Sequence, residues 1–223
     1  MTQRREFLVQ ASLLAAGTVA AGALADRLEA QPAPQGQGTT YDMSWGQRVT
    51  GKYRMAFDAP EIKDGVQLHQ VRSFFHGYAT TMGLKDSDLS AVLIIRHAAV
   101  PMVLGHELWA DGAFAEKEKL RDPVTGEPAK RNPFIEIPQG AQYTNAWPDG
   151  ALDTLMSRGT IVLACDLALM NVAGQIARRR NIPRQDAAKL IDQHILKGVY
   201  RMPSGIFATC HAQGLGCGMM YAG

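Results

Sequence analysis

The chain has 223 residues, with a formal net charge of +2 and 20% charged residues. This near balance of charges does not suggest binding to nucleic acid or to an anionic surface. The length is sufficient for one sizeable domain with a hydrophobic core, and the chain shows no internal repeat.

The N-terminus has the pattern of an export signal. Arg4 and Arg5 precede Glu6-Phe7-Leu8, which fits the R-R-x-F-L form of a twin-arginine signal, and residues 9–25 carry no charge. A receptor reads such a signal and it is then removed, so we expect a periplasmic protein that touches the membrane only during export. An uncleaved anchor is the alternative, but a stable span needs ~20 strongly apolar residues and this stretch is rich in Ala and Gly.

The rest of the chain divides by composition into a tether and a domain. Residues 31–40 are polar and rich in Pro, Gly and Gln, so residues 26–50 are expected to form a flexible tether. Residues 51–223 would then form the domain. Five prolines among residues 122–150 predict a surface insertion that lies outside the core.

The elements expected in the first half of the domain alternate in type. A strand is expected at 53–57, a helix at 66–82 that ends at Gly83, and a buried strand at 91–95 with His97 just beyond it. A further helix is expected to begin near Pro101, because proline suits the first turn of a helix.

The alternation continues to the C-terminus. We expect helices at 151–158, 167–180, 184–194 and 206–213, and strands at 160–165, 199–202 and 217–221. Asp166 is expected to cap the helix at 167–180. The pattern predicts an α/β fold, a three-layer sandwich with a mainly parallel five-stranded sheet, whose ligands bind beyond the carboxyl ends of the strands.

Short motifs in the C-terminal half resemble those of the DsrE-like family. They are a strand that ends in Cys165, the run Met202-Pro203-Ser204-Gly205-Ile206 that opens a helix, and Gln213, Gly216 and Tyr221 near the last strand. The resemblance implies a DsrE-like α/β domain that forms homo-oligomers and carries sulfur on Cys165, exchanging it with donor or acceptor proteins that the motifs do not specify. Ala98, Cys217 and the long insertion depart from the family pattern.

Cys165 and His97 are the candidate catalytic residues. Cys165 ends a central strand directly before a helix, and the positive end of the helix dipole favours a thiolate there. His97 ends the neighbouring strand and is a candidate base for the thiol. The alternatives are a packed cysteine and a structural histidine.

The C-terminus holds a cluster of soft ligands: Cys210, His211, Cys217, Met219 and Met220. In an oxidising compartment, Cys210 and Cys217 are expected to form a disulfide, which leaves Cys165 as the free thiol. The alternative is a copper(I) site, because thiolates and thioethers bind that ion preferentially.

The sequence thus favours an exported domain that handles sulfane sulfur as a persulfide on Cys165. A periplasmic copper-binding protein and a non-catalytic oligomeric binding domain remain as alternatives.

Overall fold

The computed structural model describes residues 40–142 and 147–223. They contain a five-stranded parallel sheet with the strand order β4-β3-β2-β1-β5. The strands are β1 (Tyr53–Ala59), β2 (Leu89–Ile95), β3 (Ile161–Cys165), β4 (Tyr200–Met202) and β5 (Gly218–Tyr221). The predicted signal at 1–25 and the tether as far as residue 39 lie outside the described residues.

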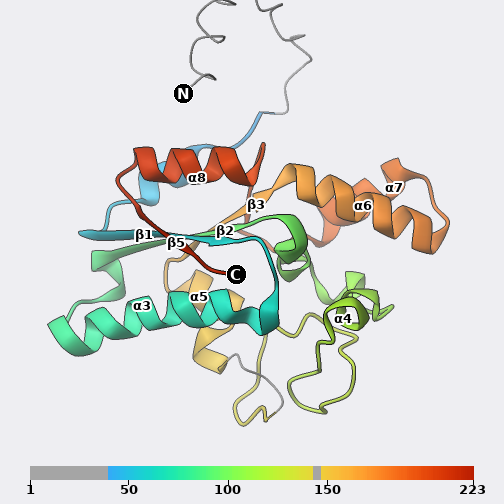
Figure 1. Cartoon of the computed structure of the whole chain (residues 1–223), viewed down its shortest axis with the longest axis horizontal. Helices are drawn as coiled ribbons and strands as arrows, with labels where there is room; N and C mark the ends of the chain where they lie inside the picture. The colour runs from blue at the N-terminus through green and yellow to red at the C-terminus, as the bar shows by residue number, and fades with distance from the viewer. Residues whose placement is uncertain (1–39, 143–146) are drawn as a thin grey trace, which may run out of the picture. The chain divides into compact units, whose positions relative to one another are not determined.

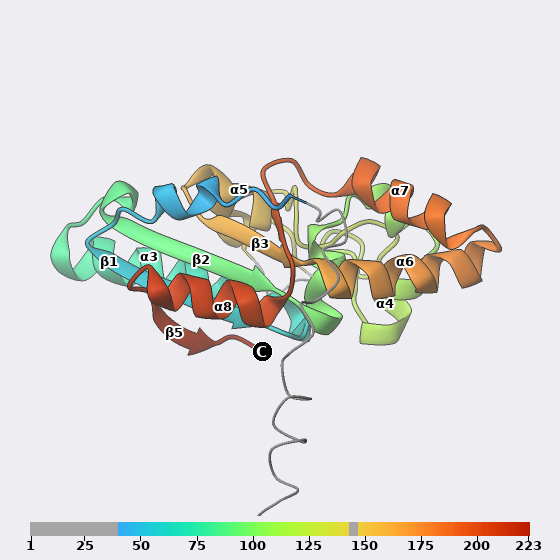
Figure 2. The ribbon, with the colours of Figure 1, turned by 90° about the horizontal axis from the view of Figure 1, so that it is seen from above.

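Helices cover both faces of the sheet, which confirms the predicted three-layer α/β sandwich. Figure 1 shows α8 (Gly205–Gly214) on one face, and α3 (Val66–Met82) and α5 (Leu152–Ser157) on the other. In Figure 2, α6 (Asp166–Arg180) and α7 (Arg184–His194) extend beyond the carboxyl ends of the strands, near α4 (Ala113–Glu118). The 3-10 turns are η1 (Ser44–Arg48), η2 (Lys63–Gly65), η3 (Asp86–Asp88), η4 (His97–Val103), η5 (His106–Leu108) and η6 (Pro148–Gly150).

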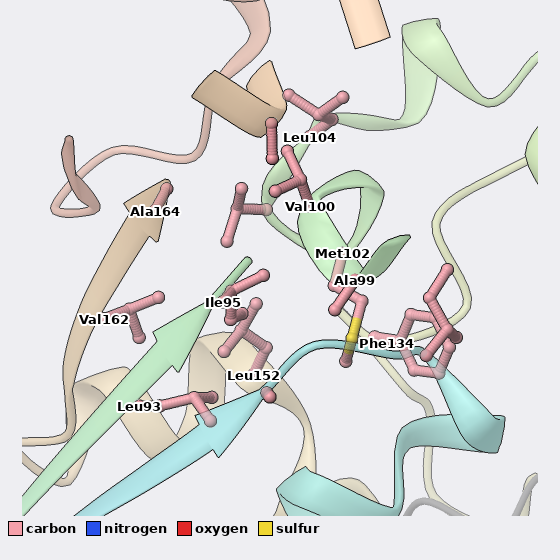
Figure 3. Close-up of a cluster of buried hydrophobic side chains, with 14 of the residues drawn as sticks. Leu93, Ile95, Ala99, Val100, Met102, Leu104, Phe134, Leu152, Val162 and Ala164 are labelled. Carbon is pink, nitrogen blue, oxygen red and sulfur yellow. The ribbon is translucent and has the colours of Figure 1, made fainter. Parts of the chain in front are cut away.

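The two faces of the sheet bury separate hydrophobic clusters because side chains alternate along each strand. In β2, Leu93 packs in the cluster below α3, α5 and α6, whereas Val92 and Ile94 pack in the cluster below α8. Figure 3 shows the first cluster, where Leu93 and Val162 from neighbouring strands meet. All seven residues of β2 are buried, as the uninterrupted apolar run predicts.

The domain begins earlier than the sequence predicts. The compact unit starts at Tyr41, and Trp45 of η1 is fully buried against α8 and the sheet. Residues 41–50, assigned to the tether, therefore belong to the domain. A tryptophan inside a polar stretch is the signal that the composition argument overlooked, because one indole ring can bury up to 250 Å².

The segment 122–150 also differs from its prediction as a surface insertion. Ala129, Asn132 and Phe134 are buried, and Phe134 packs in the main core (Figure 3). The buried Asn132 side chain donates hydrogen bonds to the carbonyl groups of Met102 and Leu104, each at 2.8 Å. The segment is rich in proline, but its apolar and amide side chains are part of the core.

Two details of the helices differ from expectation. The helix predicted near Pro101 is the 3-10 turn η4. Asp166 is the first residue of α6, and Cys165 occupies the N-cap position. Within residues 40–142 and 147–223, no helix has both the length and the apolar character needed to cross a membrane.

The burial of Trp45 predicts a large effect of its truncation. Trp45→Ala should lower the free energy of unfolding by about 3–5 kcal/mol because it leaves a cavity below α8. Its indole N–H has no hydrogen-bond partner among the described residues, so packing accounts for the loss. Urea denaturation of the same change at the exposed Trp147 is the matched control. Equal midpoints for the two variants would contradict the placement of Trp45.

Candidate functional site

Cys165 lies where the carboxyl ends of the parallel strands meet, which is the edge of such sheets that binds ligands. It is the last residue of β3 and directly precedes the 15-residue helix α6. Its neighbour in register is Met202, the last residue of β4, and α8 begins three residues later at Gly205. Two helix N-termini of positive polarity therefore follow the ends of the two adjacent strands.

The thiol of Cys165 is only slightly exposed, because the residue has 8% of its surface accessible. It contacts the core cluster below α3, α5 and α6, and it also lies close enough to Tyr41 and Arg96 for their charges to interact. Cys165 therefore lies at the boundary between core and surface. The sequence placed it correctly at the strand end but did not identify its two polar neighbours.

Arg96 is a cation within electrostatic reach of Cys165, and the sequence did not reveal this relation. It follows β2 directly, and its guanidinium donates two hydrogen bonds to Asp58 of β1: Nε to Oδ1 at 2.6 Å and Nη2 to Oδ2 at 2.8 Å. These bonds raise the pKa of Arg96, and the charges of Tyr221 and Cys165 act in the same direction. A charged residue directly after an uncharged buried strand was the available signal.

Gly205 makes room for this arginine. A Cβ atom at residue 205 would lie 2.3 Å from Cδ of Arg96 and 2.7 Å from its Cβ. Real atoms do not approach that closely, so the arginine rests on the bare backbone at the start of α8. Ser204 caps the same helix by accepting a hydrogen bond from the Phe207 N–H at 3.1 Å.

A second polar network lies on the other side of Cys165. The Asp166 carboxylate accepts hydrogen bonds from the Tyr41 hydroxyl at 3.2 Å and from Nε of Arg201 at 2.8 Å. Arg201 also forms an ion pair with Asp192 of α7. Burial and then the Asp166 charge raise the pKa of Tyr41, and Cys165 acts in the same direction. The hydroxyl of Tyr41 therefore stays protonated and donates at neutral pH.

His97 lies apart from this arrangement. It has a positive φ of 51° and lines a hollow of about 300 Å³ together with residues that include Glu61 and Glu118. Within residues 40–142 and 147–223, no hydrogen bond or ion pair links it to Cys165. The residue just before it, Arg96, binds Asp58 and lies within electrostatic reach of Cys165. Because the chain turns at the strand end, consecutive side chains diverge, and sequence adjacency could not decide between them.

The two remaining cysteines are free thiols in the structure, which differs from the predicted disulfide. Cys210 is exposed on α8, whereas Cys217 is buried beneath that helix with Trp45 and Ala212. Burial raises the pKa of the Cys217 thiol, although Arg54 acts in the opposite direction. Cys165 and Cys217 are thus both buried with an arginine within electrostatic reach, and they differ in position, because Cys165 ends a strand and directly precedes a helix.

The soft ligands of the C-terminus do not converge. Met219 packs beneath α8, whereas its neighbour Met220 is exposed, as alternation along β5 requires. His211 stacks on the ring of Phe207 and also contacts Trp45. In the part of the chain that the structure describes, no group of three or more His, Cys, Asp or Glu side chains is arranged to hold a metal ion.

The site defines a class of protein: a parallel α/β domain that presents one cysteine at the carboxyl edge of its sheet, with an arginine beside it. The chain matches no family model, no curated protein and no solved structure.

The close approach at Gly205 predicts a sensitive position. Gly205→Ala should displace Arg96 from its place beside Asp58 and cost about 1–3 kcal/mol of folding free energy. Gly214→Ala is the matched control in the same helix, because an added Cβ there meets nothing within 4 Å. Chemical denaturation of both variants measures the difference. A neutral Gly205→Ala variant would show that Arg96 is not confined by the helix.

Proposed function

We propose that the protein is an exported, DsrE-like domain that carries sulfane sulfur as a persulfide on Cys165. The observation that carries the proposal is the position of Cys165 at the N-terminus of α6, close to the Arg96 guanidinium. Both features favour a thiolate, which is the form that attacks sulfur.

The reaction needs no other oxidant. The thiolate attacks the terminal sulfur of an inorganic polysulfide and forms a new S–S bond to it. The neighbouring S–S bond of the polysulfide breaks, and its electron pair leaves with the shortened polysulfide anion. The product on Cys165 is a persulfide anion, whose charge Arg96 is placed to stabilise in the same way as that of the thiolate.

The surroundings of the site also support contact with another protein surface. Four large apolar side chains are exposed in the first turns of α6 and α8 and at the end of β5: Leu167, Ile206, Phe207 and Tyr221. An exposed group of this kind is typical of an interaction surface. It is consistent with the homo-oligomer that the family resemblance implies, and with docking of a sulfur donor or acceptor.

The central test is the reactivity of Cys165. In the folded protein at pH 7, Cys165 should react with iodoacetamide and gain one sulfur atom from polysulfide, as measured by intact mass and peptide mapping. Cys165→Ser should abolish the sulfur gain without unfolding the domain, because the change in volume is small. Cys210→Ser, at an exposed cysteine, is the matched control and should leave the gain unchanged. A Cys165 that reacts only after denaturant is added would refute the proposal.

Export is tested separately. The change of both Arg4 and Arg5 to Lys keeps the charge but removes the side chains that a twin-arginine receptor reads. We expect the precursor to accumulate in the cytoplasm, as detected by cell fractionation and immunoblotting. Unchanged export of this variant would contradict the assignment of the signal.

A further inference from the structure

The residue after Cys165 carries a negative charge, which by itself opposes thiolate formation. Asp166 is the first residue of α6, so the residue that carries this charge directly follows Cys165 in the sequence. A like charge within a few ångströms disfavours the ionised form of its neighbour. A site that works through a thiolate therefore needs this carboxylate to be offset.

Two groups from distant parts of the chain hold the Asp166 carboxylate. The Tyr41 hydroxyl donates to Oδ2 at 3.2 Å, and Arg201 of β4 donates to Oδ1 through Nε at 2.8 Å and also through Nη2. The side chains of Asp166 and Arg201 are 17% and 28% exposed, so water screens their interaction only in part. Burial acts to lower the pKa of Arg201, but Asp166 and then Asp192 raise it overall, so the guanidinium stays charged.

We propose that Tyr41 and Arg201 are positioning residues that clamp the Asp166 carboxylate and offset its charge, so that the Cys165 thiol reacts faster at neutral pH. The inference rests on the proposed function of Cys165 and adds its regulation by a neighbouring charge. Tyr41 is suited to this role because its hydroxyl contacts Asp166 and lies within electrostatic reach of Cys165.

The charged groups near the thiol explain why loss of the contacts to Asp166 should change the reactivity of Cys165. Tyr41 and Arg96 lie within electrostatic reach of Cys165. The groups that interact with these two residues are Asp166 and Arg201 beside Tyr41, and Asp58 and Tyr221 beside Arg96, while Asp192 adjoins Arg201. The network thus contains three carboxylates and two guanidinium groups. Because Asp58 already engages Arg96 through two hydrogen bonds, loss of Arg201 would leave Asp166 and Asp192 without a countercharge.

The experiment measures the rate at which iodoacetamide alkylates Cys165 in the full mature chain between pH 6 and pH 10, with peptide mapping to assign the label. Arg201→Gln should lower the rate at pH 7 by about three- to tenfold, the effect of one charge at partly screened distance. Arg201→Lys should retain most of the rate because it keeps the charge. Tyr41→Phe removes only the hydroxyl and should lower the rate about twofold by loss of one hydrogen bond.

Two features separate the clamp from a merely structural effect. The rates of all variants should converge as the pH is raised toward 10, because the clamp changes the charge around the thiol and not access to it. Asp166→Asn should raise the rate at pH 7, and Arg201→Gln should have little further effect in that background, because the carboxylate that it offsets is gone. Urea midpoints of each variant confirm that the rates report folded protein.

Three results would overturn the proposal: an unchanged rate in Arg201→Gln, a loss that persists at pH 10, or the same loss in the presence and absence of Asp166. Uptake of sulfur from polysulfide, measured on the same samples, tests the function separately. A Cys165 that follows the expected pattern of rates but gains no sulfur would support the clamp and remove the persulfide carrier.

Discussion

The ion pair between Asp58 and Arg96 connects the ends of two strands to the start of α8 and lies within electrostatic reach of Cys165. Its two residues lie at the ends of adjacent strands β1 and β2, and two hydrogen bonds of 2.6 and 2.8 Å fix the plane of the guanidinium. A planar fork held at two points loses its freedom to rotate, so the charge stays fixed on Asp58, within electrostatic reach of Cys165. The same arginine excludes any side chain at residue 205, where the backbone of α8 begins. The start of α8, the ends of two strands and the thiol thus depend on one contact.

The site differs from an isolated cysteine at the start of a helix because the carboxylates near it are paired with arginines. The dipole of α6 favours an anion at Cys165, whereas the Asp166 carboxylate opposes it. Arg96 is largely committed to Asp58, and Arg201 is shared by Asp166 and Asp192. Because these contributions oppose one another, changes in this network should alter the reactivity of the thiol.

Local sequence patterns predicted much of the fold because they depend on residues close in the chain. The helix α3 has the bounds expected from its apolar spacing and from Gly83, which adopts the left-handed conformation at its end. The same holds for α7, which begins after Pro183. Residues whose partners are distant were harder to place. Trp45 packs below α8, and Phe134 enters the core from a proline-rich segment, so neither is explained by its local composition.

The candidate site shows the same division between local and distant information. Cys165 could be placed at a strand end from its own segment, but its guanidinium neighbour could not. Arg96 and Asp58 are 38 residues apart, and only the parallel register of β1 with β2 brings them together. His97 was preferred because an imidazole is a common base, yet its side chain lines the hollow formed with Glu61 and Glu118. After β2, Arg96 binds Asp58 and packs against Gly205 of α8, and both partners are distant in the chain.

Differences in burial among the three cysteines bear on how a labile sulfur would survive outside the cytoplasm. Cys210 is exposed and open to any oxidant or thiol, whereas Cys217 is enclosed beneath α8 and its thiol has a raised pKa through burial. Cys165 is nearly as buried as Cys217, with 8% against 7% of its surface accessible, but it lies at the carboxyl edge of the sheet. A small polysulfide can approach such a thiol more easily than a folded protein can, which would limit unwanted disulfide exchange. Release of the sulfur to a protein acceptor would then require contact close enough to cover the rim of Leu167, Ile206, Phe207 and Tyr221.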